Sequence, residues 1–247
     1  MKCSIKYLLI RLGQHTSDYA IHSLDAVANY LAVGRWLKKQ GLEVPTRFKD
    51  RYRLFDFVAP ELQDAQVLYL EFGVWEGASM RYWAKLLRNE KSILHGFDSF
   101  EGLPEKWTHN CEASRGYFST NGRIPVINDQ RIKFFKGWFE ETLPKYVLPM
   151  HDRLFVNLDA DLYSSTKVVL ECLKEHITRG TYLYFDDFSD RYEQLKAFDE
   201  FLEETGMRVR VIGANQDLSS VIFQRTDGSI AGPAQVPESE GALQCHF

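Results

Sequence analysis

The 247-residue sequence has few cysteines, no long apolar run and no excess of basic residues. Its four cysteines are scattered without a CxxC pair, which argues against a structural zinc site and favours a reducing compartment. The apolar stretch Tyr7–Ile10 is far shorter than the roughly 20 residues of a membrane-spanning helix, and it lacks the features of a secretory signal. Thirty basic residues against 34 acidic ones argue against a nucleic-acid-binding protein. We therefore expect a cytoplasmic protein that binds neither nucleic acid nor membrane.

Short apolar runs alternate with helical patterns from Val67 onward. The runs predict strands at 67–73, 93–98, 132–136, 154–159 and 180–186, followed by two closing strands at 209–212 and 220–224. Helical spacing covers 79–87, 166–176 and 192–204. This alternation predicts an α/β protein with a mostly parallel sheet covered by helices on both faces. The linker between the closing strands is too short for a crossover helix, so we expect that pair to be antiparallel.

Three other regions differ from this pattern. Residues 1–60 contain helical spacing that ends at Gly41 and a second short helix over 51–59. We interpret both as packing helices, with a lid or a dimer contact as the alternative. Residues 99–128 have no clear period and predict an extended loop. Residues 227–247 are rich in Gly, Ser, Pro and Ala and predict a flexible tail. The expected organisation is a helical region over 1–60, a main domain over 61–226 and the tail.

An acidic turn containing glycine follows the first predicted strand. Glu71 and Glu76 flank Gly73 and would repel a diphosphate, so the turn suits a ligand with a cationic centre and an amino group. S-adenosylmethionine has both groups. Asp98 ends the second strand, where a carboxylate can bind the two hydroxyls of a ribose. The alternative is a plain strand-to-helix connection with Asp98 as a turn residue.

A second group of carboxylates follows the fourth and fifth strands. If these strands are neighbours, Asp159, Asp186 and Asp187 lie together and repel one another unless a cation is present. Oxygen ligands without His or Cys favour Mg²⁺, Mn²⁺ or Ca²⁺ over zinc. The alternative is helix capping, because Asp190-x-x-Glu193 has the form of a capping box.

Five segments, in order and with compatible spacing, resemble the macrocin O-methyltransferase family, which includes the novobiocin-pathway sugar O-methyltransferase. They are LEFGVWEGAS (70–79), GFDSFEGLP (96–104), GWFEETLP (137–144), LDADLYSST (158–166) and DDF (186–188). The resemblance implies a Rossmann-like class I methyltransferase fold. Such a fold has a seven-stranded, mainly parallel sheet with an antiparallel last strand and helices on both faces, here with extra N-terminal helices. The segment 61–226 is then the S-adenosylmethionine-dependent methyltransferase domain.

The resemblance also implies site residues. The family's metal, usually Mg²⁺ (or Mn²⁺), would be held by Asp159, Asp186 and Asp187. The positions that match the family's cofactor-binding residues are Glu71, Gly73 and Asp98. Neighbouring candidates for S-adenosylmethionine binding in the same motifs are Gly77, Ser79, Ser99, Gly137 and Trp138.

We therefore expect a metal-dependent O-methyltransferase that acts on a hydroxyl of a small molecule, a sugar or a glycosylated natural product. Methylation of a small phenolic or catechol substrate is the alternative within enzymes. The lysine that related catechol enzymes carry three residues after the first metal ligand is Leu162 here. A non-catalytic cofactor-binding relative is the other alternative. The family resemblance favours a homo-oligomer.

The catalytic base is expected among the carboxylates after the fourth strand. Asp161 lies two residues beyond Asp159, so a continued strand would point both side chains to the same side. Asp161 could then accept the proton of the attacked hydroxyl, with Asp159 as a rival and Asp190 and His109 as weaker ones. The structural alternative is that Asp161 caps the helix beginning near Ser164.

Overall fold

The computed structural model describes residues 3–107 and 113–226. The chain divides into two units, one ending at Gly41 and the other beginning at Leu42. The first unit contains helices α1 (Cys3–Gly13) and α2 (Asp18–Gln40). The Ser17 side chain accepts a hydrogen bond from the backbone N–H of Ala20 at the start of α2, and Gly41 ends the helix in a left-handed conformation. The expected helix ending at Gly41 is confirmed.

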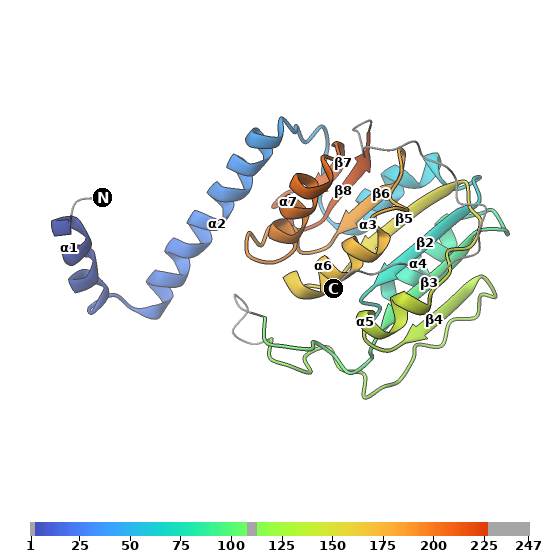
Figure 1. Cartoon of the computed structure of the whole chain (residues 1–247), viewed down its shortest axis with the longest axis horizontal. Helices are drawn as coiled ribbons and strands as arrows, with labels where there is room; N and C mark the ends of the chain where they lie inside the picture. Colours follow the sequence, from blue (N-terminus) through green and yellow to red (C-terminus); the bar gives the residue numbers. More distant parts are fainter. Residues whose placement is uncertain (1–2, 108–112, 227–247) are drawn as a thin grey trace. The chain divides into compact units, whose positions relative to one another are not determined.

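The second unit is built on one sheet in the order β1-β7-β8-β6-β5-β2-β3-β4 (Figure 1). Strand β8 is antiparallel to both of its neighbours, and the other pairs are parallel. The seven predicted strands and the antiparallel closing pair are confirmed. The eighth strand, β1, was not predicted because two residues carry no pattern. The strands are β1 (Arg47–Phe48), β2 (Val67–Phe72), β3 (Ile93–Asp98), β4 (Ile132–Lys136), β5 (Arg153–Leu158), β6 (Tyr182–Phe185), β7 (Val209–Asn215) and β8 (Val221–Arg225).

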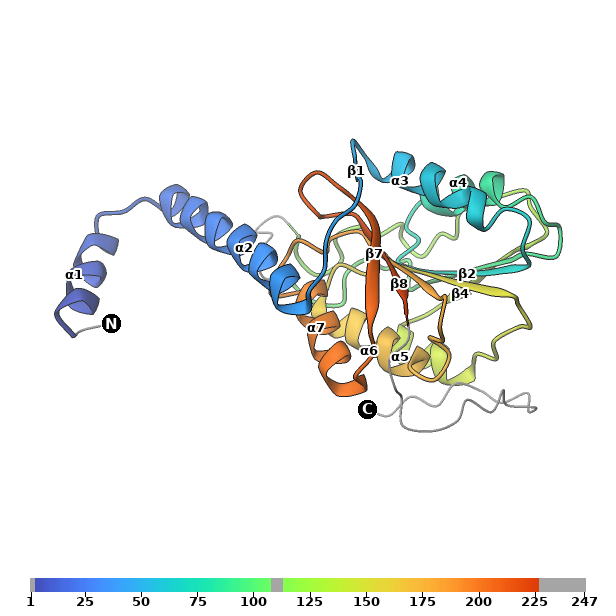
Figure 2. The ribbon, with the colours of Figure 1, turned by 90° about the horizontal axis from the view of Figure 1, so that it is seen from above.

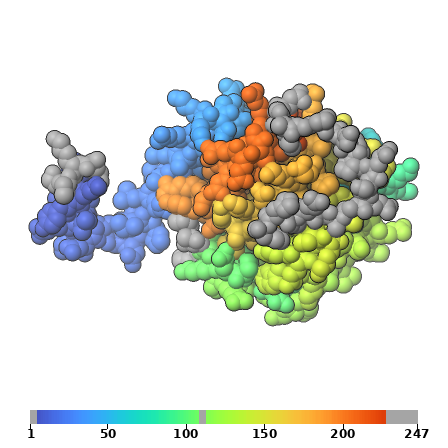
Figure 3. All heavy atoms as spheres, in the orientation of Figure 1, coloured from blue at the N-terminus to red at the C-terminus, as the bar shows by residue number. Residues whose placement is uncertain are grey.

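Helices cover both faces of the sheet, as predicted (Figure 2). Helices α3 (Arg51–Val58) and α4 (Ala78–Leu86) lie on one face. Helices α5 (Phe139–Thr142), α6 (Tyr163–Leu173) and α7 (Gln194–Thr205) lie on the other. In the space-filling view, the yellow and orange atoms of α6 and α7 make up much of this second face (Figure 3). Short 3₁₀ turns follow α3 (Ala59–Glu61) and α5 (Leu143–Lys145).

Aromatic rings hold α3 against the sheet. Phe55 of α3 is fully buried, and its ring centroid lies 4.9 Å from that of Tyr184 on β6 and 5.2 Å from that of Trp83 on α4. Trp83 continues the stack to Phe155 on β5 at 4.4 Å. Because tilted and edge-to-face ring pairs add to the energy of burial, these contacts fix α3 over the carboxyl ends of the central strands.

The expected loop over 99–128 contains no helix or strand in its described part, 99–107 and 113–128. A small apolar cluster of Leu103, Trp107 and Ala113 packs this segment against Leu162, which follows β5. The loop is therefore fixed beside the ends of the strands. The predicted tail at 227–247 and the candidate base His109 lie outside the described residues.

Cys172 on α6 is buried and disulfide-bonded, which the scattered spacing of the cysteines did not indicate.

Over the described residues, none of the helices combines the length and the apolar character that crossing a membrane requires.

The aromatic contacts of α3 lead to a stability prediction. Phe55→Ala should lower the free energy of unfolding by about 3–5 kcal/mol, because it leaves a cavity between α3, α4 and β6. Phe57→Ala on the same helix is the matched control, since Phe57 is 47% exposed. Urea unfolding of the two variants measures the difference. Equal losses for both would contradict this account of α3.

Candidate active site

A cavity of about 250 Å³ opens where the carboxyl ends of β2, β3, β5 and β6 meet. Parallel strands with helices on both faces place their ligand sites at this edge. The cavity is lined by seven of the eight predicted cofactor-binding residues, namely Glu71, Gly73, Ser79, Asp98, Ser99, Gly137 and Trp138. It is also lined by four aspartates that follow β5 and β6, namely Asp159, Asp161, Asp186 and Asp187. Gly77, the eighth, lies instead at the N-cap of α4.

Gly73 lets the turn after β2 touch the end of β5. Its φ is +88°, a region that favours glycine, and a Cβ placed there would lie 1.8 Å from the carbonyl oxygen of Asp159. The position therefore accepts only glycine. The close approach holds the acidic turn and Asp159 together at one edge of the cavity.

Asp98 ties the two turns at the cavity together. Its Oδ2 accepts hydrogen bonds from the backbone N–H groups of Val74 (2.8 Å) and Trp75 (2.7 Å), and its Oδ1 accepts from that of Phe100 (2.6 Å). A carboxylate has about four acceptor sites, so Asp98 keeps some capacity for the hydroxyls of a ligand.

Glu71 is a buried carboxyl group at the end of β2. It is 1% exposed, and its Oε2 accepts a hydrogen bond from the Tyr69 hydroxyl at 2.7 Å. The Tyr69 oxygen in turn accepts from Asn157 on β5 at 2.8 Å. Burial raises the pKa of Glu71 to about 8, although the Tyr69 hydrogen bond and the charge of Arg51 act in the opposite direction. Glu71 is therefore a titrating group near neutral pH.

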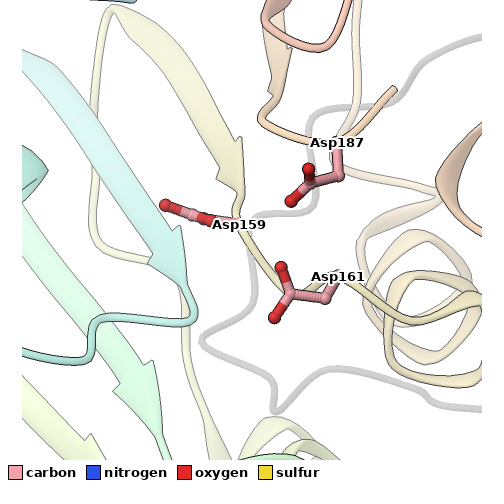
Figure 4. A group of neighbouring side chains, drawn as sticks. All are labelled: Asp159, Asp161 and Asp187. Carbon is pink, nitrogen blue, oxygen red and sulfur yellow. The ribbon is translucent and has the colours of Figure 1, made fainter. Parts of the chain in front are cut away.

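Three carboxyl groups converge on the other side of the cavity (Figure 4). Asp159 and Asp161 follow β5 and Asp187 follows β6, and one oxygen of each lies within 4.8 Å of the others. Asp161 has a φ of +57°, a strained value for a residue other than glycine. This left-handed turn aims the Asp161 side chain at Asp187, with which it shares a hydrogen bond.

Crowding changes the acidity of all three groups. Burial and the charges of Asp186 and Asp161 raise the pKa of Asp159 well above its ordinary value. Burial and Asp187 raise the pKa of Asp161 in the same way. Burial and the charge of Asp186 raise the pKa of Asp187 to about 6. Partial burial and neighbouring like charges disfavour ionisation, and a bound cation would favour it.

Asp186, which the resemblance places among the metal ligands, lines the same cavity but is paired there with other side chains. Its Oδ1 accepts hydrogen bonds from the hydroxyls of Tyr184 and Ser220. Its Oδ2 lies 2.8 Å from Nη1 of Arg51 on α3. The structure thus groups Asp161, and not Asp186, with Asp159 and Asp187. The metal set Asp159, Asp186 and Asp187 stays a prediction.

The three-carboxylate group fits a small divalent cation. It offers oxygen ligands only, which suit Mg²⁺ and Mn²⁺. Three mutually repelling carboxyl groups have a physical reason to bind one. Asp159 and Asp187 would hold the ion in this arrangement, and Asp161 is placed either to join them or to act as a base beside them.

The hydrogen bonds at the start of α6 and before α7 show whether the acidic residues there cap these helices. Leu162 occupies the N-cap of α6 and makes no side-chain cap hydrogen bond, and the first backbone N–H of α6, from Tyr163, donates to Glu193 at 2.6 Å. Asp161 therefore does not cap α6. Asp190 accepts from the backbone N–H of Tyr192 and from the Trp107 indole, as expected of a turn residue.

Two residues at the site were missed by the sequence reasoning. Gln194, fully buried at the start of α7, accepts from the backbone N–H of Asp187 and donates to the carbonyl of Leu158. It thereby fixes the ends of β5 and β6 relative to each other. Arg51 was missed because it belongs to a predicted packing helix. The sequence feature that could have identified Arg51 is its charge, because it begins a short helix expected to pack against the sheet.

A sequence model of the macrocin O-methyltransferase family matches residues 61–225 of the chain. The chain belongs to this family. The match begins before β2 and ends with β8, so it covers the cavity and both acidic segments. Arg51 and α3 precede it.

Two curated relatives of this family member come from Streptomyces. The 8-demethyl-8-(2,3-dimethoxy-alpha-L-rhamnosyl)-tetracenomycin-C 4'-O-methyltransferase of Streptomyces olivaceus is 30% identical over 49% of this chain and 52% of its own length. The demethyldecarbamoylnovobiocin O-methyltransferase of Streptomyces niveus is 26% identical over 64% of this chain and 65% of its own length. The chain thus spans between half and two thirds of the curated relatives it matches.

Solved structures support the fold of this family member. The O-methyltransferase NovP matches with a TM-score of 0.55 at 22% identity, over 71% of this chain and 78% of NovP. The calicheamicin methyltransferase CalS11 matches with a TM-score of 0.52 at 22% identity, over 70% and 76% of the two chains. The predicted class I methyltransferase fold is confirmed.

The raised pKa of Glu71 predicts a pH-dependent stability. Between about pH 4.5 and about pH 8 the unfolded chain releases the Glu71 proton and the folded chain keeps it. The free energy of unfolding should therefore fall as pH rises through this window, by up to about 1.4 kcal/mol per pH unit, and level off above it. Glu71→Gln, which still accepts from Tyr69, should remove this component.

Urea unfolding of the metal-free protein at several pH values measures the effect. Glu76→Gln in the same turn is the matched control, because Glu76 is exposed. Curves for wild type and Glu71→Gln that stay parallel across the window would contradict the assignment.

Proposed function

We propose that this chain transfers the methyl group of S-adenosylmethionine to a hydroxyl of a sugar or a glycosylated natural product, with Mg²⁺ or Mn²⁺ bound at the carboxylates. The observation that carries the proposal is the single cavity that joins the acidic glycine turn of β2 to Asp159, Asp161 and Asp187. Family membership and the names of the two Streptomyces relatives support O-methylation of a glycosylated acceptor.

The cofactor side of the cavity would be formed by the turns after β2, β3 and β4. Glu71 offers a carboxyl oxygen to the amino group of the cofactor, and Asp98 offers carboxylate oxygens to its ribose hydroxyls. Gly73 and Gly137 expose backbone that a ligand can approach closely, and Trp138 lines the cavity beside them. Their shared edge would place the sulfonium methyl toward the carboxylates.

The acceptor side would be formed by the carboxylates and an aromatic pair. Trp75 and Phe118 line the cavity, are 46% and 37% exposed, and meet edge to face with centroids 5.5 Å apart. Exposed rings offer an apolar surface for one face of a sugar or aromatic acceptor. Phe118 comes from the 99–128 loop, so this loop would help to select the acceptor.

The reaction requires a positioned hydroxyl and a proton acceptor. When bound, the divalent ion would supply positive charge that orients the acceptor oxygens and lowers the pKa of the attacked hydroxyl. Asp161 would accept its proton, directly or through one water, as the oxygen attacks the methyl carbon in line with the departing sulfur. Asp159 is the rival proton acceptor. The packed 99–107 segment would limit the entry of water.

A methyl-transfer assay tests the proposal. S-adenosylhomocysteine should form from S-adenosylmethionine with rhamnosyl glycosides as acceptors and Mg²⁺ or Mn²⁺ present, and formation should stop in EDTA. Asp187→Asn should lower turnover by at least about 100-fold, because changes to the partners of metal ligands alone cost about 10–100-fold. Asp64→Asn is the control, since Asp64 is exposed at the opposite end of the sheet, before β2 begins.

Each other outcome identifies an alternative. Full activity in EDTA would remove the metal from the proposal. Turnover of catechol and not of sugars would favour a phenolic acceptor. Binding of S-adenosylhomocysteine without any turnover would favour a non-catalytic relative.

Asp161→Asn tests the assignment of the base. Turnover should fall by about two to four orders of magnitude, the usual range for removing a general base, while the affinity for S-adenosylhomocysteine stays unchanged. Calorimetric titration with Mn²⁺ separates the two roles open to this residue. Unchanged Mn²⁺ affinity identifies a base, weakened affinity identifies a ligand, and an unchanged rate would exclude both.

A further inference from the structure

Helices α1 and α2 of the first unit expose much apolar surface. Twelve Ile, Leu, Val and Tyr side chains between residues 5 and 31 are 46% or more exposed. Together they offer on the order of 1,000 Å² of apolar surface, whereas the largest apolar patch of a typical monomer covers roughly 300–600 Å². A stable protein–protein interface buries about 800 Å² on each partner. The apolar surface of this unit is therefore large enough for such an interface.

Helix α1 carries apolar side chains around most of its circumference. The consecutive residues Tyr7, Leu8, Leu9 and Ile10 are between 50% and 66% exposed. Because four consecutive residues complete more than one turn of a helix, these side chains point in all directions. The helix has 11 residues, and isolated helices shorter than about 12–15 residues are marginal in water. A helix of this length and composition needs a surface to pack against.

Helix α2 has an exposed apolar stripe along one side. The stripe consists of Ile21, Leu24, Ala28 and Leu31, which follow one another at spacings of three and four residues. All four are exposed, Leu24 to 64% and Leu31 to 70%. Alternating spacings of three and four are the pattern by which two long helices pack along a common seam. A surface helix normally buries such a stripe, so this one is suited to a partner helix.

Small residues beside the stripe allow a close approach. Ala20, Val27 and Gly34 recur every seven residues along one edge of it. A Cβ placed on Gly34 would meet nothing within 4 Å, so the space beside this residue is open. Glycine inside a helix is less favourable than alanine, and close approach of another backbone is one reason for its presence.

The charges of α2 favour an antiparallel copy of the same helix as the partner. Residues 18–29 contain Asp18 and Asp25 and no Lys or Arg, whereas residues 30–40 contain one Arg, two Lys and no acidic residue. Two antiparallel copies bring the acidic half of each helix beside the basic half of the other, and their helix dipoles are opposed. A parallel pair would place like charges together. The helix is thus complementary to itself, as a two-fold interface requires.

We propose that α2 packs antiparallel against α2 of a second copy of this chain, so that the N-terminal units form the interface of a homodimer. In this arrangement Leu24 lies beside Ala28 of the second copy and Ile21 beside its Leu31, with Val27 near the two-fold axis. The apolar side chains of α1 add to the same interface. The proposal is independent of the metal and of the methyl acceptor.

Light scattering after size-exclusion chromatography measures the mass of the full chain. Wild type should have the mass of a dimer. Leu24→Glu combined with Leu31→Glu should halve this mass at the same concentration, because association would bury unpaired charges in the seam. Glutamate forms helix about as well as leucine, so α2 itself should persist.

His22→Glu combined with Ala26→Glu is the matched control. It adds the same two charges to the same helix, at exposed positions outside the stripe. We expect it to remain a dimer. A control that dissociates as readily as the stripe variant would overturn the assignment, because the effect would then reflect charge alone. A monomeric wild type would also overturn it, and binding of that monomer to vesicles of anionic phospholipid would assign the stripe to a lipid surface instead.

Disulfide cross-linking tests the orientation of the two helices. A mixture of Ile21→Cys and Leu31→Cys should form a linked dimer on oxidation, and each variant alone should stay at the background set by wild type and its own cysteines. Efficient cross-linking of each variant to itself would indicate a parallel pair and overturn the antiparallel arrangement.

Titration of the monomeric stripe variant with S-adenosylhomocysteine separates this proposal from the proposed function. Retained binding shows that the second unit is folded, so that a loss of mass reports the interface. A dimer without methyl transfer would leave this proposal standing and overturn the proposed function, whereas methyl transfer by a monomeric wild type would do the reverse.

Discussion

Mutual repulsion among carboxyl groups is the constraint around which this site is organised. Parallel strands β5 and β6 are neighbours, so the acidic residues that follow them are brought to one place by the sheet itself. Each of these carboxyl groups has an interaction or a raised pKa that reduces the repulsion. Asp186 is paired with Arg51 and hydrogen-bonded by Tyr184 and Ser220, Asp161 and Asp187 share a hydrogen bond, and the pKa of Asp159 is raised. Such an arrangement favours the binding of a cation, which stabilises the ionised carboxylates.

The surrounding fold holds the carboxyl ends of β5 and β6 in place. Gly73 allows backbone contact between the turn after β2 and Asp159, and buried Gln194 joins the ends of β5 and β6 through two hydrogen bonds. The aromatic stack from Phe55 to Phe155 fixes α3, and through it the position of Arg51. Residues in sparsely populated backbone conformations persist only where their surroundings hold them, as for Asp161 with its φ of +57°.

The sequence predicts the sheet well and the directions of the site's side chains poorly. Buried parallel strands are continuous apolar runs, so all seven long strands are readable, and Asp159, Asp186 and Asp187 are correctly placed at strand ends. The sequence predicted Asp161 beside Asp159 from a continued strand, but β5 ends at Leu158, and a left-handed turn at Asp161, which the residue types do not predict, brings it to Asp159 and Asp187. The orientation of Asp186 toward α3 depends on Arg51. That contact forms only when folding brings residue 51 beside residues 159 and 186. Such long-range pairing leaves no local pattern.

This dependence bears on where the functional unit of the chain begins. The family match starts at residue 61. Arg51, whose guanidinium contacts Asp159 and Asp186 within the matched segment, lies ten residues before it. A fragment limited to the matched segment would keep the acidic residues and the glycine turn but lose Arg51 and the buried face of α3. Breaking a partly buried ion pair from one side leaves the remaining charge without its partner, which is destabilising although solvent screens part of the effect. In physical terms, the structural unit that holds these carboxylates therefore includes α3, although neither the acidic motifs nor the family match contains it.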